Sequence, residues 1–137
     1  MDLNTTLRTL FLAIAAASAN VAFGWGVVGH EVVCEIAYRE LAPRARREID
    51  RLAKSETDAR FRTFRRACVW PDRVDDGRRP EHYVNVPRQW SRIPRAACVE
   101  ADRCIFTAIR ADIEIVASDA HTDEHRWTAA KYLGQWI

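Results

Sequence analysis

Four cysteines constrain how this chain can fold, because they occur within 137 residues, at positions 34, 68, 98 and 104. If all four form disulfides, three pairings are possible. Cys98 and Cys104 enclose a short polar loop and could pair locally, which would leave Cys34 for Cys68. That second bond would tie the first predicted helix to the segment that carries Trp70-Pro71-Asp72.

Disulfides require an oxidising compartment, and residues 1–24 have the features of a secretory signal. Arg8 is followed by an apolar, alanine-rich run over 10–21, and Ala22 and Gly24 are small residues at the −3 and −1 positions of a cut before Trp25. The alternative is an uncleaved anchor, but the apolar run is short for a membrane span. We therefore expect one exported domain, secreted or periplasmic, that does not act in a membrane.

The net charge of +2 is too small to indicate nucleic-acid binding by itself. Arginines nevertheless crowd one short stretch, at positions 60, 62, 65, 66, 73, 78 and 79. This clustering gives weak support for a polyanionic substrate, and a merely solvated surface is the alternative.

Apolar periodicity predicts an all-α fold with helices over 30–41, 43–54, 58–68, 104–116 and 124–137. In the fourth helix Ile105, Ile109, Ile113 and Val116 should face inward. Prolines at 71, 80, 87 and 94 predict a long loop region over 71–98, with one extended piece near 82–86, and such loops are often functional. The last periodic stretch shows no helix stop signal, so the sequence predicts a truncated domain.

Several residues could carry metal chemistry. After cleavage, the α-amine and carbonyl oxygen of Trp25 could chelate a divalent cation, and His30 could add an imidazole nitrogen. Asp72 and His82 are further oxygen and nitrogen donors of the kinds that zinc accepts. Taken singly, these residues are as readily explained as a core tryptophan, a helix-face histidine, a loop acid and a surface histidine. His121 and His125, spaced four apart in a polar turn, are predicted to be solvated.

In combination, the WGxxGH stretch at 25–30, Trp70-Pro71-Asp72, His82-Tyr83-Val84-Asn85 and a helix led by a cysteine resemble the N-terminal part of the S1/P1 nucleases. The resemblance extends from Trp25 to Ile137. Members share a mostly helical fold with the zinc phospholipases C. They are secreted, hold three zinc ions and cut single-stranded DNA and RNA to 5′-nucleotides, and many also remove 3′-phosphates.

The resemblance implies a role for each motif residue. Trp25 and His30 would bind one zinc, and Asp72 and His82 a second. Tyr83 would stack on a base, as the exposed π-faces of single strands permit, and Asn85 would meet a base edge. The positions of the first two cysteines are similar to the plant-type pattern, which supports the Cys34–Cys68 pairing.

This chain also departs from the family pattern. Members continue with further ligands, including a bridging carboxylate and a third zinc site, so we expect at most two partial sites and an inactive fragment here. Gln135 stands where a zinc-binding histidine is expected, and Asp75 where many members have a basic residue, which Arg73, Arg78 or Arg79 could replace. The alternatives are a zinc phospholipase C-like hydrolase and a non-catalytic exported helical module. No stable protein partner is implied.

Overall fold

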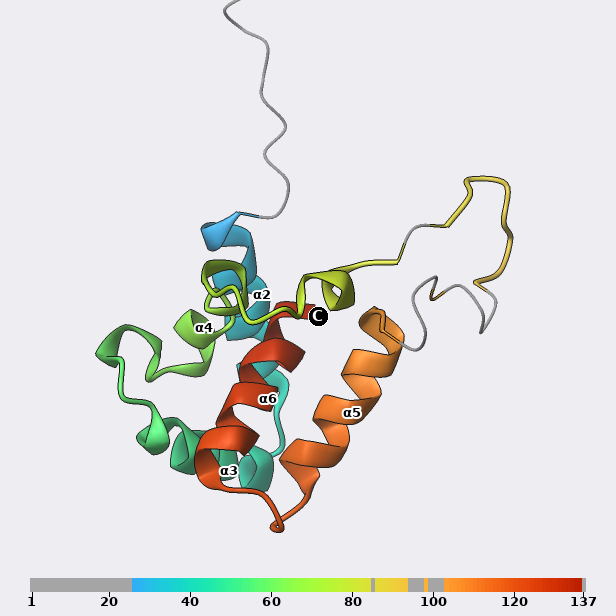
Figure 1. Ribbon diagram of the computed structural model, residues 1–137. Coiled ribbons are helices and arrows are strands. Elements are labelled where there is room, and N and C mark those ends of the chain that lie inside the picture. Colours follow the sequence, from blue (N-terminus) through green and yellow to red (C-terminus); the bar gives the residue numbers. More distant parts are fainter. Residues whose placement is uncertain (1–25, 85, 94–97, 99–102, 137) are drawn as a thin grey trace, which may run out of the picture.

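The computed structural model describes residues 26–84, 86–93, 98 and 103–136, and within these ranges it contains helices and no strand. The α-helices are α2 (Val27–Glu40), α3 (Pro43–Leu52), α4 (Phe64–Ala67), α5 (Ile105–Ala117) and α6 (Asp123–Trp136). Four 3₁₀ turns accompany them, at Ala53–Ser55, Ala59–Phe61, Pro71–Arg73 and Arg79–His82. The predicted all-α class is confirmed. Helix α6 runs through the middle of the molecule, between the other helices (Figure 1).

The helix starts follow from local chemistry. Pro43 occupies the first turn of α3, where its fixed φ and missing N–H are tolerated. At α5 the Cys104 N–H donates to Thr107 Oγ1 at 3.1 Å, as part of a capping box. At α6 the Thr122 hydroxyl accepts from the His125 N–H at 3.2 Å, and Asp123 and Glu124 complement the dipole of the first turn.

One predicted helix is wrong. Residues 58–68 form a 3₁₀ turn and the single-turn α4 in place of one continuous helix. The side chain of Asp58 accepts the Arg60 N–H at 3.0 Å, which closes a local turn, and Thr63 is extended at φ −125° and ψ 141°. The loop region 71–98 also holds more order than expected, since two 3₁₀ turns occupy it, although Tyr83 itself is extended.

The core forms where α6 crosses the disulfide between Cys34 of α2 and Cys68, whose Cα atoms are 6.5 Å apart. The bond joins α2 to the end of α4, and both sulfur-bearing residues are fully buried. The buried cluster around it comprises Cys34, Leu52, Ala53, Phe64, Ala67, Cys68, Trp127 and Ala130. The second disulfide joins Cys98 to Cys104 with Cα atoms 5.3 Å apart, so both bonds match the expected pairing.

Gly134 permits this crossing. A Cβ atom at that position would lie 2.2 Å from Cys68 Sγ and 3.2 Å from Cys34 Sγ. Neither sulfur can move aside easily, because the disulfide is itself enclosed in the core. Glycine is therefore the residue that lets α6 approach the bond.

A buried ion pair and its hydrogen bonds also hold α6 in place. Glu56 accepts from Trp127 Nε1 at 3.1 Å and from Lys131 Nζ at 2.8 Å. Lys131 also lies over the ring of Trp70, 3.7 Å from its centroid. Burial opposes ionisation of Glu56, but these donors hold its pKa below the usual value.

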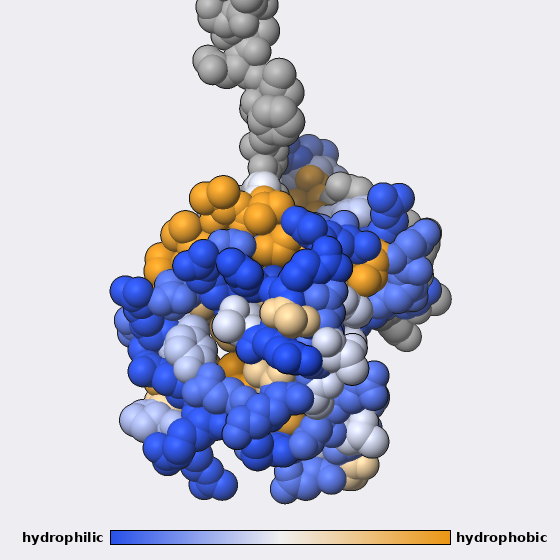
Figure 2. All heavy atoms as spheres, turned by 90° about the vertical axis from the view of Figure 1, so that its left-hand side faces the viewer, coloured by the Kyte–Doolittle hydropathy of each residue, from blue (hydrophilic) through white to orange (hydrophobic). Residues whose placement is uncertain are grey.

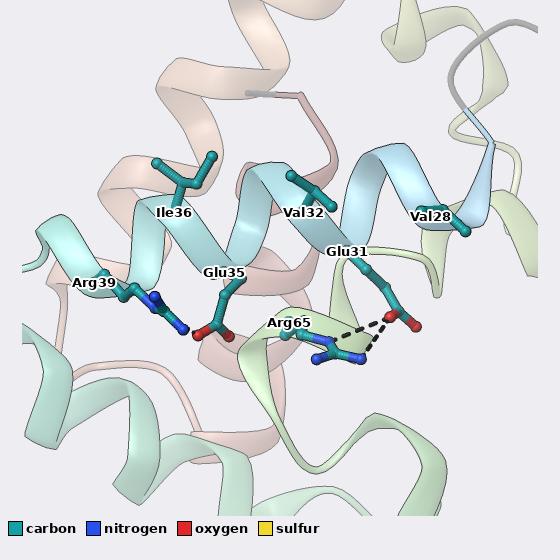
Figure 3. A pocket seen from close by; sticks show the side chains of 7 residues that line it. All are labelled: Val28, Glu31, Val32, Glu35, Ile36, Arg39 and Arg65. Atoms are coloured by element: carbon teal, nitrogen blue, oxygen red, sulfur yellow. Dashed lines mark hydrogen bonds and ion pairs between the residues drawn. The ribbon is translucent and has the colours of Figure 1, made fainter.

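Exposed apolar side chains occur on α5 and α2, and one of them, Ile113, was expected to face inward. Ile113 of α5 is 53% exposed, whereas its neighbour Asp112 is buried at 1%. On α2, Val28, Val32 and Ile36 form an outward stripe, exposed at 74%, 52% and 56%. Figure 2 shows apolar side chains gathered on this side of the molecule, and Figure 3 shows Glu31 and Arg65 pairing beside the shallow groove along the stripe.

Among the helices that the structure describes, none has both the length and the apolar character of a membrane span. The predicted signal segment lies outside the described residues. The two disulfides are compatible with an extracellular protein.

We expect Gly134→Ala to lower the free energy of unfolding by about 1–3 kcal/mol, the usual cost of overpacking a core. Urea unfolding would measure the change. Thr128→Ala on the same helix adds no atoms and is the matched control. Equal stabilities of the Gly134→Ala variant and the parent would show that α6 has room at the disulfide.

Stability should also fall in acid. Glu48 accepts from Arg51 and pairs with Arg126 of α6, and the hydrogen bond from Arg51 is the main reason that its pKa is lowered from 4.5 to about 2. A lowered native pKa contributes stability above the unfolded value, and this contribution disappears as the pH falls from 4.5 towards 2.

Thermal melts across that window should therefore show a shallower loss for Glu48→Gln than for the parent. The difference should be small, because the Glu48 side chain is 37% exposed and solvent screens the pair. Glu40→Gln is the control, since Glu40 forms no ion pair with the described residues. A steeper acid transition in Glu48→Gln would contradict the assignment.

Candidate metal centre

The crossing at the disulfide brings three polar side chains together. His30 lies one helical turn before Cys34 on α2, Asp72 lies four residues after Cys68, and Gln135 directly follows Gly134 on α6. Gln135 Nε2 is 2.8 Å from Asp72 Oδ1 and 3.2 Å from His30 Nε2. Positions that are far apart in the sequence thus converge at one end of α6.

Asp72 faces two imidazole rings with its two oxygens. Oδ2 is 3.4 Å from His30 Nε2, and Oδ1 is 3.7 Å from His82 Nδ1. Donor atoms around one tetrahedral zinc, each about 2.0–2.1 Å from the ion, lie roughly 3.3 Å from one another. The donor types are those that zinc accepts, and the two separations of 3.4 and 3.7 Å are near this value.

The fit is partial. Within the described ranges, no three His, Cys, Asp or Glu side chains surround a single point as a metal cluster would. Asp72 instead forms one pair with His30 and another with His82, and each pair supplies two of the three protein ligands usual for a catalytic zinc. Trp25 and Asn85, which were predicted to add a chelate and a base contact, lie outside the described residues, so their roles remain predictions.

Aromatic rings hold His82 in place. Its ring meets Tyr132 and Trp136 edge-on, with centroids 6.1 and 6.5 Å away. Tyr132 is fully buried and donates its hydroxyl to Asp76 Oδ2 at 2.5 Å. Burial and this hydrogen bond raise the pKa of Tyr132, so the hydroxyl remains a donor. Sequence reasoning missed these residues, although Tyr132 and Trp136 are four apart on one helix face.

The guanidinium of Arg78 is fully engaged in contacts within the protein. It donates to Asp112 Oδ2 at 2.9 Å and to Glu81 Oε2 at 2.6 Å, and its guanidinium stacks 3.8 Å from the centroid of Tyr132. Burial raises the pKa of Asp112, and the Arg78 guanidinium acts in the opposite direction. Of the three arginines considered as replacements for a basic residue at Asp75, Arg78 is therefore unsuited to binding phosphate.

The other two arginines line an open pocket beside the Asp72–His82 pair. This pocket has a volume of about 600 Å³, and its walls include Arg73, Arg79 and Tyr83. Neither arginine forms an ion pair with the described residues. Tyr83 is 56% exposed, so its ring is open to a planar ligand. His121 is partly buried and lies in the turn before α6, and His125 is exposed in the first turn of that helix, far in sequence from Gln135.

Comparison with known proteins decides the family. Residues 25–137 match the family model described as S1/P1 Nuclease. The chain belongs to the S1/P1 nuclease family. It is similar to Endonuclease 2 of Arabidopsis thaliana, with 31% identity over 108 residues, or 74% of this chain and 35% of that relative. The chain thus spans about a third of the length of this curated relative.

The Arg78–Asp112 pair can be tested directly. Asp112→Asn should lower the free energy of unfolding by about 1–3 kcal/mol, because it weakens a charge-assisted hydrogen bond and leaves Arg78 less compensated. Chemical denaturation would measure the loss, with the exposed Glu114→Gln on the same helix as the control. A more stable Asp112→Asn protein would mean that burying Asp112 costs more than its ion pair contributes.

Proposed function

We propose that this chain carries part of the zinc site of a secreted nuclease that hydrolyses phosphodiester bonds in single-stranded DNA and RNA to 5′-nucleotides. We extend the proposal to removal of 3′-phosphates. Convergence of His30 and His82 on the two oxygens of Asp72 is the observation that carries it. The S1/P1 membership supports hydrolysis of nucleic acid over the phospholipase alternative.

The proposed ligands are Trp25 and His30 for one zinc, and Asp72 and His82 for another. Bound zinc would activate water and offset negative charge on phosphate oxygens. The two oxygens of Asp72 lie 3.4 Å from His30 Nε2 and 3.7 Å from His82 Nδ1, and the edge-on rings of Tyr132 and Trp136 restrict rotation of His82.

The pocket beside the ligands suits a single strand. Tyr83 would stack on a base, which requires an unpaired nucleotide, and Asn85 would contact the base edge. Arg73 and Arg79 would bind phosphates, and they outnumber the one uncompensated acid there, Asp75, among the described pocket residues. We expect the chain itself to be inactive in nucleic-acid hydrolysis, because each donor pair lacks a third ligand.

The first test measures zinc content and binding of a single-stranded oligonucleotide by the purified chain. The parent should retain zinc and prefer single-stranded to double-stranded DNA. Asp72→Asn should lose zinc, because Asp72 serves both histidines. Tyr83→Ala should weaken single-strand binding about 5–100-fold, corresponding to one lost stacking contact. Arg73→Ala should weaken binding and reduce its salt dependence.

Arg44→Ala, an exposed arginine on α3, is the matched control and should change neither property. A parent chain that retains no zinc, or binds both forms of DNA equally, would overturn the proposed function. Zinc-dependent cleavage within about tenfold of the rate of Endonuclease 2 would show that two donors suffice, against our expectation.

A further inference from the structure

The two polar atoms of the Gln135 side-chain amide differ in their contacts. Its Nε2 donates to Asp72 Oδ1 at 2.8 Å and lies 3.2 Å from His30 Nε2. Its Oε1 is buried and has no hydrogen-bond partner among the residues that the structure describes. A buried carbonyl oxygen without a partner is unfavourable, so this orientation of the amide needs an explanation.

The carboxylate of Asp72 provides that explanation. Without a cation, an N–H group is what a carboxylate accepts, so the nitrogen of the amide turns towards Asp72 and the oxygen is left unpaired. A cation bound by Asp72 would reverse this preference, because amide hydrogens carry positive partial charge. A half-turn about the last side-chain torsion exchanges Nε2 and Oε1 with little change in the position of the group.

The exchanged oxygen would occupy a ligand position. It would lie about where Nε2 now lies, 2.8 Å from Asp72 Oδ1 and 3.2 Å from His30 Nε2. The 2.8 Å separation from Asp72 Oδ1 is close to the roughly 3.3 Å expected between two donors of one zinc, here the ion that Asp72 and His82 would bind. Amide oxygen is a harder ligand than imidazole nitrogen and suits Mn²⁺ as well as Zn²⁺.

We propose that Gln135 is an amide switch of the metal centre. Without metal its N–H group bridges Asp72 and His30, and with a divalent cation its carbonyl oxygen becomes a ligand beside Asp72. This rests on the proposed function, since it requires that Asp72 and its histidines bind a cation. It adds that oxygen at position 135 makes the centre less selective for zinc over manganese than a nitrogen ligand would.

The test compares the affinities of Zn²⁺ and Mn²⁺ for the parent and three variants, by competition with a fluorescent chelator. Gln135→Leu should bind zinc about 10–100-fold more weakly, because it removes the oxygen. Gln135→Glu should bind more tightly than the parent, because it presents oxygen in every rotamer. Gln135→His should raise zinc affinity and increase the ratio of zinc to manganese affinity.

A second readout follows the side-chain amide of Gln135 by nitrogen-15 NMR. Added zinc should remove the hydrogen bond to Asp72 and shift both amide protons, with Gln89 of the same chain as an internal reference. Equal zinc affinity in Gln135→Leu and the parent, or amide protons that do not move, would overturn the switch. If zinc still binds and Asp72→Asn abolishes that binding, the proposed function survives this failure. If neither the parent chain nor any variant binds zinc, both proposals fail.

Discussion

The crossing of α6 over the Cys34–Cys68 disulfide determines the rest of the structure. Gly134 allows contact because a side chain there would overlap Cys68 Sγ. The same contact fixes the positions of the residues next to the crossing, namely His30 on α2, Asp72 after the second cysteine and Gln135 on α6. The positions of the candidate ligands are therefore a consequence of how the core packs.

Buried ion pairs hold the two flanks of α6 in register with this crossing. On one flank Lys131 pairs with Glu56 at 2.8 Å, and on the other Arg78 joins Asp112 to the ring of Tyr132. Isolated buried charges are costly, so such pairs stabilise only the arrangement that satisfies both partners. Tyr132 in turn packs against His82, and the ion pair of Arg78 thereby supports a proposed ligand that it does not touch.

The sequence predicted the helices whose apolar periodicity was long, and both disulfides, because these features are local or few in number. It failed where tertiary contacts override periodicity. Asp112 lies on the buried face of α5, whereas Ile113 is exposed. The buried carboxylate is stabilised by its ion pair with Arg78, which lies 34 residues earlier in the sequence. The helix predicted over 58–68 breaks because the Asp58 side chain closes a turn. The resemblance implied a pairing of Asp72 with His82 but did not place His30 beside them, and spacing alone cannot bring three segments together.

The neighbouring positions 134 and 135 serve different purposes, the first in the core and the second in the candidate metal centre. Gly134 serves the fold and tolerates no side chain, whereas Gln135 points into the centre and is only partly buried. The backbone of α6 is set by the glycine, so the residue after it can change from a nitrogen to an oxygen donor without moving the helix. The same amide nitrogen lies 2.8 Å from Asp72 Oδ1 and 3.2 Å from His30 Nε2. In the proposed centre, the preference among cations would therefore depend on one rotatable group at a position that the core already fixes.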